Sequence, residues 1–190
     1  MKKEGKPRIR LIAVDLDGTL LTSKSVMASE GARLLKVASR DGIHVILVTG
    51  RIIHSGRDLC GSLEIDSPVI CTDGSQVYES LNGPVLKSLT FPREIGLEIA
   101  GLADANGWEL STTIGLVTYY RRRPGHALGP LSTGRVVVAT NSDAVTDNPT
   151  RILASDPGAI KAISTLCKSE SWGQCRVETY HGKDGEINSV

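Results

Sequence analysis

The chain has few aromatic residues and no long apolar run, and its charges nearly cancel. Aromatic side chains make up 4% of the 190 residues, so a surface that stacks nucleic-acid bases is not expected. The formal net charge of +1 provides no field for nucleic acid or for an anionic membrane. The apolar stretch 9–14 contains Arg10 and is too short for a signal sequence or a membrane span. We therefore expect a cytoplasmic protein that binds neither nucleic acid nor membrane.

Closely spaced cysteines are also lacking. The chain has four cysteines, and no two of them have the CxxC spacing of a zinc or redox motif: Cys60, Cys71, Cys167 and Cys175. Reduced thiols of a cytoplasmic protein are the simplest interpretation. A small anionic ligand is not excluded by any of these absences, because it needs only a local pocket.

The first part of the chain alternates between strand and helix patterns. Apolar segments rich in β-branched residues predict buried strands at 9–14, 43–48 and 68–71. Apolar residues at helical spacing predict helices over 28–40 and 52–63. Strand, helix, strand, helix, strand is typical of a parallel sheet with right-handed crossovers.

After residue 71 the pattern changes to hairpins. The turn residues at 82–84 indicate a hairpin between strands at 76–79 and 85–89. Helices are predicted over 92–106 and 157–168. The remaining predicted strands are 108–113, 116–120, 136–139, 151–154 and 174–180. This change predicts a separate α+β layer from about residue 85 onward.

Two carboxylates follow the first predicted strand directly, in the segment Asp15-Leu16-Asp17-Gly18. In an open parallel sheet, ligands bind beyond the carboxyl ends of the strands. A turn at Gly18 can present backbone N–H groups to an anion, but two carboxylates would repel it. A divalent cation with oxygen ligands, most simply Mg²⁺, would neutralise them. An acidic turn without function is the alternative for this segment.

A calcium-binding loop is excluded for the same segment. Counted from Asp15, such a loop requires an acidic or amide residue at position five, glycine at six and a glutamate at twelve. The chain has Thr19, Leu20 and Val26 at these positions.

The second predicted strand also ends in polar residues, Thr49-Gly50-Arg51. A hydroxyl, a glycine N–H and a cation at a strand-to-helix junction can bind phosphate. Alone, the triplet is more typical of a helix-capping turn than of a phosphate site. Arg51 has two interpretations: it contacts a substrate, or it pairs with an acidic residue and braces the loop.

Together, segments 15–21 and 49–51 resemble the haloacid dehalogenase-like hydrolase superfamily, and most closely its Cof-type branch of sugar-phosphate phosphatases. Segment 72–78 resembles a third motif of that branch, with Asp73 where asparagine is usual. The resemblance implies a partial Rossmann-like α/β core over residues 1–84. It also implies an inserted α+β cap domain over residues 85–190.

The resemblance further implies a role for each residue that matches the motifs. Asp15 would be the nucleophile that forms an aspartyl-phosphate, and Asp17 the general acid and base. Asp15 and the Asp17 carbonyl would bind Mg²⁺. The phosphoryl group would be held by the remaining residues of the two motifs: Leu16, Gly18, Thr49, Gly50 and Arg51. The substrate would be a small phosphorylated molecule, such as a sugar phosphate.

Two further motifs of the superfamily, a lysine and an acidic cluster, are not recognisable after Tyr78; Lys183 is a poor candidate for the lysine. We therefore expect a core start plus a cap, truncated at the C-terminus, with little activity alone and a tendency to self-associate. Three functions stay open: a phosphatase, a phosphotransferase or mutase of the same superfamily, and a non-catalytic fragment or binding module. The run Arg121–Arg123 is either a solvated basic turn or a substrate contact.

Overall fold

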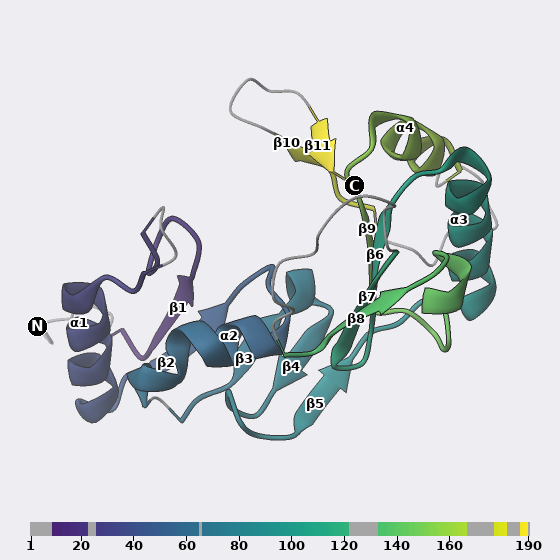
Figure 1. Ribbon diagram of the computed structural model, residues 1–190. Helices are drawn as coiled ribbons and strands as arrows, with labels where there is room; N and C mark the ends of the chain where they lie inside the picture. Colours follow the sequence, from purple (N-terminus) through teal and green to yellow (C-terminus); the bar gives the residue numbers. More distant parts are fainter. Residues whose placement is uncertain are drawn as a thin grey trace, which may run out of the picture. The chain divides into compact units, whose positions relative to one another are not determined.

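The computed structural model describes residues 9–22, 26–64, 66–121, 133–166, 177–181 and 187–189. The chain forms two compact units, Met1–Ser88 and Leu89–Val190, each with its own sheet (Figure 1). In the described part of the chain, no helix is both long and apolar enough to cross a membrane.

The first unit contains the alternating elements that the sequence predicts. Its strands are β1 (Leu11–Asp15), β2 (His44–Val48), β3 (Val69–Cys71), β4 (Gln76–Tyr78) and β5 (Val85–Ser88). Its helices are α1 (Ser29–Arg40), α2 (Ile53–Cys60) and the 3₁₀ turns η1 (Gly61–Leu63) and η2 (Thr72–Gly74). The predicted helix over 52–63 is therefore divided, and the division lies at Gly61, a residue that disfavours helix.

The sheet of the first unit has the strand order β1-β2-β3-β4-β5. Pairs β1–β2 and β2–β3 are parallel, whereas β3–β4 and β4–β5 are antiparallel. The parallel layer is as predicted, but the sheet continues into a hairpin. Strand β5 thus belongs to the first unit, and the division at Ser88 and Leu89 lies one strand beyond residue 84. A cap role for the second unit stays a prediction.

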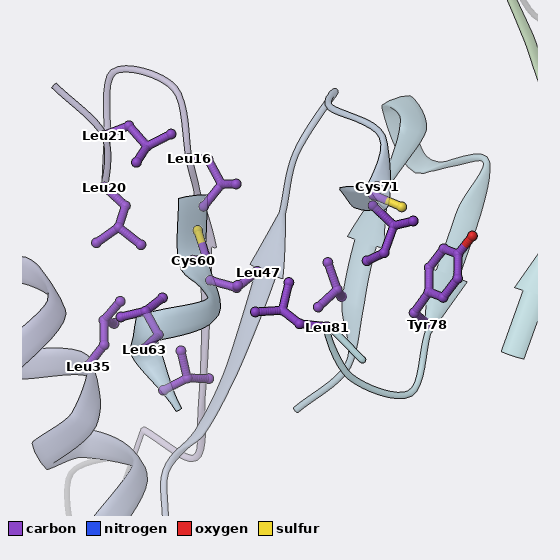
Figure 2. Close-up of a cluster of buried hydrophobic side chains, with 13 residues drawn as sticks. Leu16, Leu20, Leu21, Leu35, Leu47, Cys60, Leu63, Cys71, Tyr78 and Leu81 are labelled. Atoms are coloured by element: carbon purple, nitrogen blue, oxygen red, sulfur yellow. The ribbon is translucent and has the colours of Figure 1, made fainter. Parts of the chain in front are cut away.

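A cluster of thirteen buried side chains fills the core of the first unit (Figure 2). Leu16, Leu20 and Leu21 join this cluster from the loop after β1, and each is at most 3% exposed. Full burial of a leucine contributes about 1.5–3 kcal/mol. The loop that carries the predicted site is therefore anchored in the core by its apolar residues, while Asp15 at the end of β1 and Asp17 within the loop are exposed.

The second unit is an α+β layer. Its elements are α3 (Arg93–Asn106), β6 (Leu110–Ile114), β7 (Val117–Arg121), β8 (Arg135–Val138), η3 (Ser142–Ala144), β9 (Arg151–Ala154) and α4 (Pro157–Leu166). The sheet has the order β8-β7-β6-β9. Leu110 and Ala154 pack with Ile99 of α3 and Ile160 of α4 in a second core, so the two helices share one face of this sheet.

A short ribbon of β10 (Tyr180–His181) and β11 (Ile187–Ser189) completes the second unit. The prediction of a strand over 174–180 is wrong for residues 177–179, which are irregular. Residues 174–176 lie outside the described residues, as do Arg122, Arg123 and Lys183. The apolar pattern that indicated this strand is short and contains Glu178 and Thr179, and a pattern of that length does not define strand ends.

Candidate active site

The carboxyl ends of β1, β2 and β3 lie at one edge of the first sheet. In the parallel register Asp15 is opposite Val48, and Val48 is opposite Ile70. The chain beyond these positions is also paired, since Thr49 N donates to the carbonyl of Ile70 at 2.9 Å. The two sequence segments predicted to form the site are therefore neighbours in space.

The loop after β1 is a tight turn with glycine at its bend. Gly18 has φ +79°, in the left-handed region that glycine adopts most readily. Its N–H donates to the carbonyl of Leu21 at 3.2 Å, so this donor is already used within the turn. Gly18 thus contributes the shape of the loop, whereas the sequence predicted that its N–H would hold phosphate. Leu16 is fully buried, so only its backbone can face a ligand.

Arg51 and Asp17 form a two-point ion pair across the site. Arg51 Nε donates to Asp17 Oδ2 and Arg51 Nη2 donates to Asp17 Oδ1, both at 2.7 Å. This bond, aided by the charge of Arg51, lowers the pKa of Asp17 below its ordinary value, although partial burial acts in the opposite direction. Asp17 is therefore a carboxylate at neutral pH in this arrangement.

Thr49 directly follows β2 and is 4% exposed. Its Oγ1 accepts a hydrogen bond from Arg51 N at 3.1 Å. A threonine hydroxyl carries one proton of its own, so Thr49 can still donate to a phosphoryl oxygen. The position of Thr49 suits the role that the motif implies.

The loop after β3 packs closely on the loop after β2, which the sequence did not reveal. Thr72 N donates to the carbonyl of Arg51 at 2.8 Å. A Cβ placed on Gly50 would lie 2.5 Å from Asp73 Oδ1. Thr72 and Asp73 both have positive φ, 52° and 53°, which costs energy for residues other than glycine and is common at functional sites. The resemblance of segment 72–78 to a family motif drew attention to Asp73, but it assigned no role to Thr72.

The donor set for a metal ion is small. Asp15 is exposed at the end of β1, and the Asp17 carbonyl accepts none of the turn's backbone hydrogen bonds in the described part of the chain. Among the described residues there is no group of three or more His, Cys, Asp or Glu side chains that could hold a metal. Mg²⁺ commonly uses one or two carboxylates and fills its shell with water and phosphate oxygens. One carboxylate and one carbonyl fit that mode of binding.

The two described cysteines, Cys60 and Cys71, form no disulfide in the described part of the chain, and both are buried in the core of the first unit. Burial raises the pKa of the Cys60 thiol to about 11. Cys60 is therefore a protonated core residue and not a nucleophile. The predictions for Cys167 and Cys175 lie outside the described residues.

Carboxylates, a hydroxyl and a guanidinium beyond the carboxyl ends of parallel strands define an α/β protein with a ligand site at the open edge of its sheet. The family model of haloacid dehalogenase-like hydrolases matches residues 12–177. The chain belongs to this family, which confirms the resemblance in the sequence.

Individual relatives support the same assignment. The chain is 36% identical over 72 residues to the 5-amino-6-(5-phospho-D-ribitylamino)uracil phosphatase YcsE of Bacillus subtilis (strain 168), a match that covers 38% of this chain and 29% of the relative. The chain thus matches less than a third of the length of that relative.

Solved structures share the fold. A haloacid dehalogenase-like hydrolase from Bacteroides thetaiotaomicron superposes with a TM-score of 0.74 at 19% identity, over 96% of this chain and 71% of that one. The HAD subclass IIB sugar phosphatase BT4131 superposes with a TM-score of 0.68 at 15% identity, over 95% and 68% of the two chains.

Proposed function

We propose that this chain carries the nucleophile half of a Mg²⁺-dependent phosphomonoester hydrolase that works through an aspartyl-phosphate on Asp15. The observation that carries the proposal is the alignment of Asp15, Asp17 and Thr49 at one sheet edge. The family assignment and the phosphatase activity named for a relative support it.

Within this proposal each residue has one task. Asp15 attacks phosphorus, and Thr49 and the Gly50 N–H, with the backbone of Leu16, hold phosphoryl oxygens. Asp17 as a carboxylate takes a proton from the attacking water, and only in its protonated form, released from both oxygens' pairing with Arg51, does it give a proton to the leaving alcohol. Bound Mg²⁺, held by Asp15 and the Asp17 carbonyl, would supply positive charge next to the transferring group.

The electrostatics of the edge favour a cation together with the substrate. Asp15, Asp17 and Asp73 bring three carboxylates against the guanidinium of Arg51, whose fork faces Asp17. A phosphomonoester adds roughly two further negative charges. A divalent cation offsets this excess, so we propose that phosphate binds well only in its presence.

The substrate is proposed to be a small phosphorylated molecule of the sugar-phosphate type, as the name of the subclass IIB neighbour suggests. The test is hydrolysis of a panel of sugar phosphates and one generic phosphomonoester by the chain, with Mg²⁺ or with EDTA. Phosphate release that depends on Mg²⁺ and is lost in Asp15→Asn supports the proposal. Measurable release of equal size by wild type and Asp15→Asn would rule the proposal out.

A further inference from the structure

The guanidinium of Arg51 is positioned by its own backbone as well as by its partner. Its N–H donates to Thr49 Oγ1 at 3.1 Å, and its carbonyl accepts from Thr72 N at 2.8 Å. The side chain then reaches Asp17 with two bonds of 2.7 Å. One residue thus connects the loops that follow β1, β2 and β3.

Planar two-point pairing is specific to arginine. The fork of Nε and Nη2 matches the two oxygens of a carboxylate, a geometry that the single ammonium of lysine cannot reproduce. The same edge of the guanidinium cannot hold two phosphoryl oxygens while it holds both oxygens of Asp17. A direct phosphate contact by this fork would require the pair with Asp17 to break.

The Asp17 side chain needs a partner that fixes its orientation. Its side chain is 53% exposed, and the turn below it fixes the backbone but not the carboxyl group. A proton-transfer group must be held close to productive geometry to contribute fully.

We propose that Arg51 is a positioning residue that acts through Asp17 and is not a ligand of the phosphoryl group. This inference rests on the proposed function and replaces the phosphate-binding role that the sequence motif suggested for Arg51. In this proposal the orientation of the Asp17 carboxyl group, in the loop after β1, is fixed by Arg51, in the loop after β2.

Two anions separate these roles without any need for turnover. Inorganic phosphate resembles the ground state, whereas orthovanadate can take the five-coordinate shape of the transition state and places an apical oxygen toward the proton-transfer group. Substitution of a residue that contacts the phosphoryl group should weaken the binding of both anions. Substitution of a residue that acts through Asp17 should weaken mainly the binding of vanadate.

The experiment measures the Kd of each anion with Mg²⁺ for wild type, Arg51→Gln, Arg51→Lys, Asp17→Asn and Asp17→Asn/Arg51→Gln. Arg33→Gln is the matched control, because Arg33 makes the same kind of two-point pair with Glu30 at 2.9 and 2.7 Å on α1. Thermal melting of every variant accompanies the titrations.

For both Arg51 variants we expect vanadate to bind about tenfold more weakly or worse and phosphate to stay within about threefold. In the Asp17→Asn background, Arg51→Gln should add no further loss, as expected when two residues act as one unit. Arg33→Gln should leave both affinities unchanged.

If the Arg51 variants lose affinity for phosphate and vanadate equally, Arg51 contacts the phosphoryl group and the inference is overturned. The same conclusion follows if Arg51→Gln still weakens binding in the Asp17→Asn background. Wild-type affinity for both anions in Arg51→Gln would also overturn the inference, because it would show that Arg51 does not position Asp17. Failure of the wild type to bind either anion with Mg²⁺ would instead overturn the proposed function, and this inference with it.

Discussion

Gly50 leaves little room for a side chain. The Asp73 carboxylate occupies the space into which a Cβ would project, 2.5 Å from its ideal position. Real Cβ atoms do not approach an oxygen so closely, so a larger residue at position 50 requires the Asp73 side chain to move. Glycine at this position is therefore explained by packing between two loops of the site.

We predict that Gly50→Ala destabilises the protein by about 1–3 kcal/mol, the usual cost of overpacking. Urea denaturation measures the effect. Gly61→Ala is the control, because Gly61 has no atom within 4 Å of its Cβ position and has φ −56°. Gly61→Ala should be neutral or slightly stabilising. Equal stability of Gly50→Ala and wild type would contradict the packing between Gly50 and Asp73.

Some residues of the site were predictable from the sequence and others were not. Asp15, Asp17 and Thr49 follow strong strand patterns, and the edge of a parallel sheet brings such residues together. The partner of Arg51 was left open, because sequence spacing does not define the direction of a long side chain. The positive φ of Thr72 was not predictable, since β-branched residues rarely adopt it and tertiary packing imposes it.

At the scale of elements, the carboxylate of Asp104 on α3 holds the chain at the start of η3. Asp104 accepts four hydrogen bonds of 2.8–2.9 Å, two from Asn141 and two from Ser142. Asn141 is 1% exposed and also bonds to the backbone of Trp108 and Leu110. Asp104 therefore satisfies polar groups that would otherwise be buried without partners.

We predict that Asp104→Ala lowers the free energy of unfolding by about 2–4 kcal/mol, because it removes a charged acceptor from buried donors. Urea denaturation measures the loss, and hydrogen exchange should localise it to residues 139–148. Asp147→Ala is the control, since Asp147 is exposed and, in the described part of the chain, its carboxylate accepts a hydrogen bond only from the adjacent Asn148 N. A loss of similar size in both variants would refute the special role of Asp104.

Asp104 should also make the stability of the folded protein sensitive to acid. Burial by itself raises the pKa of Asp104, but hydrogen bonds from Asn141 and Ser142 and the charge of Arg121 outweigh it and lower the pKa below its ordinary value. A lowered pKa in the folded state gives stability that is present above the unfolded value, about 3.9, and is lost as the pH falls through the folded value. Stability measured from pH 5 downward should fall more steeply in wild type than in Asp104→Ala. Parallel curves would contradict this prediction.

Elements were easier to predict than their partnerships. The four α-helices of the described residues begin within about two residues of their predicted starts, because apolar spacing defines them, and Gly42 and Gly107 mark the ends of α1 and α3. The hairpin of β4 and β5 was predicted, but the predicted division at residue 84 placed β5 in the second unit, whereas β5 belongs to the first sheet. Its four residues are all exposed, so its sequence pattern gave no core face to assign.

At the scale of the whole molecule, the first unit presents an open sheet edge beside exposed apolar residues. Within the described residues β1 pairs only with β2, which leaves its outer edge available. Leu11 on β1 and Leu34 on α1 are 50% and 52% exposed. An unpaired edge with apolar neighbours favours association with another chain.

We predict that the purified chain self-associates and that Leu11→Lys/Leu34→Lys shifts it toward monomer. Light scattering after size-exclusion chromatography measures the mass. Leu116→Lys is the control, because Leu116 is similarly exposed, at 43%, but lies in the second unit. A wild-type chain that stays monomeric at high concentration would count against the prediction.

The central claim is that Asp15 becomes phosphorylated, and chemical trapping tests it most directly. The chain is incubated with Mg²⁺ and a reactive phosphate donor such as acetyl phosphate, and then treated with borohydride, which reduces an aspartyl-phosphate to homoserine. Peptide mass spectrometry then locates the modified residue. If Asp15 is the nucleophile, homoserine forms at position 15, its formation depends on Mg²⁺, and it is absent in Asp15→Asn. Modification at Asp17 or Asp73 instead, or no modification of any aspartate, would contradict it.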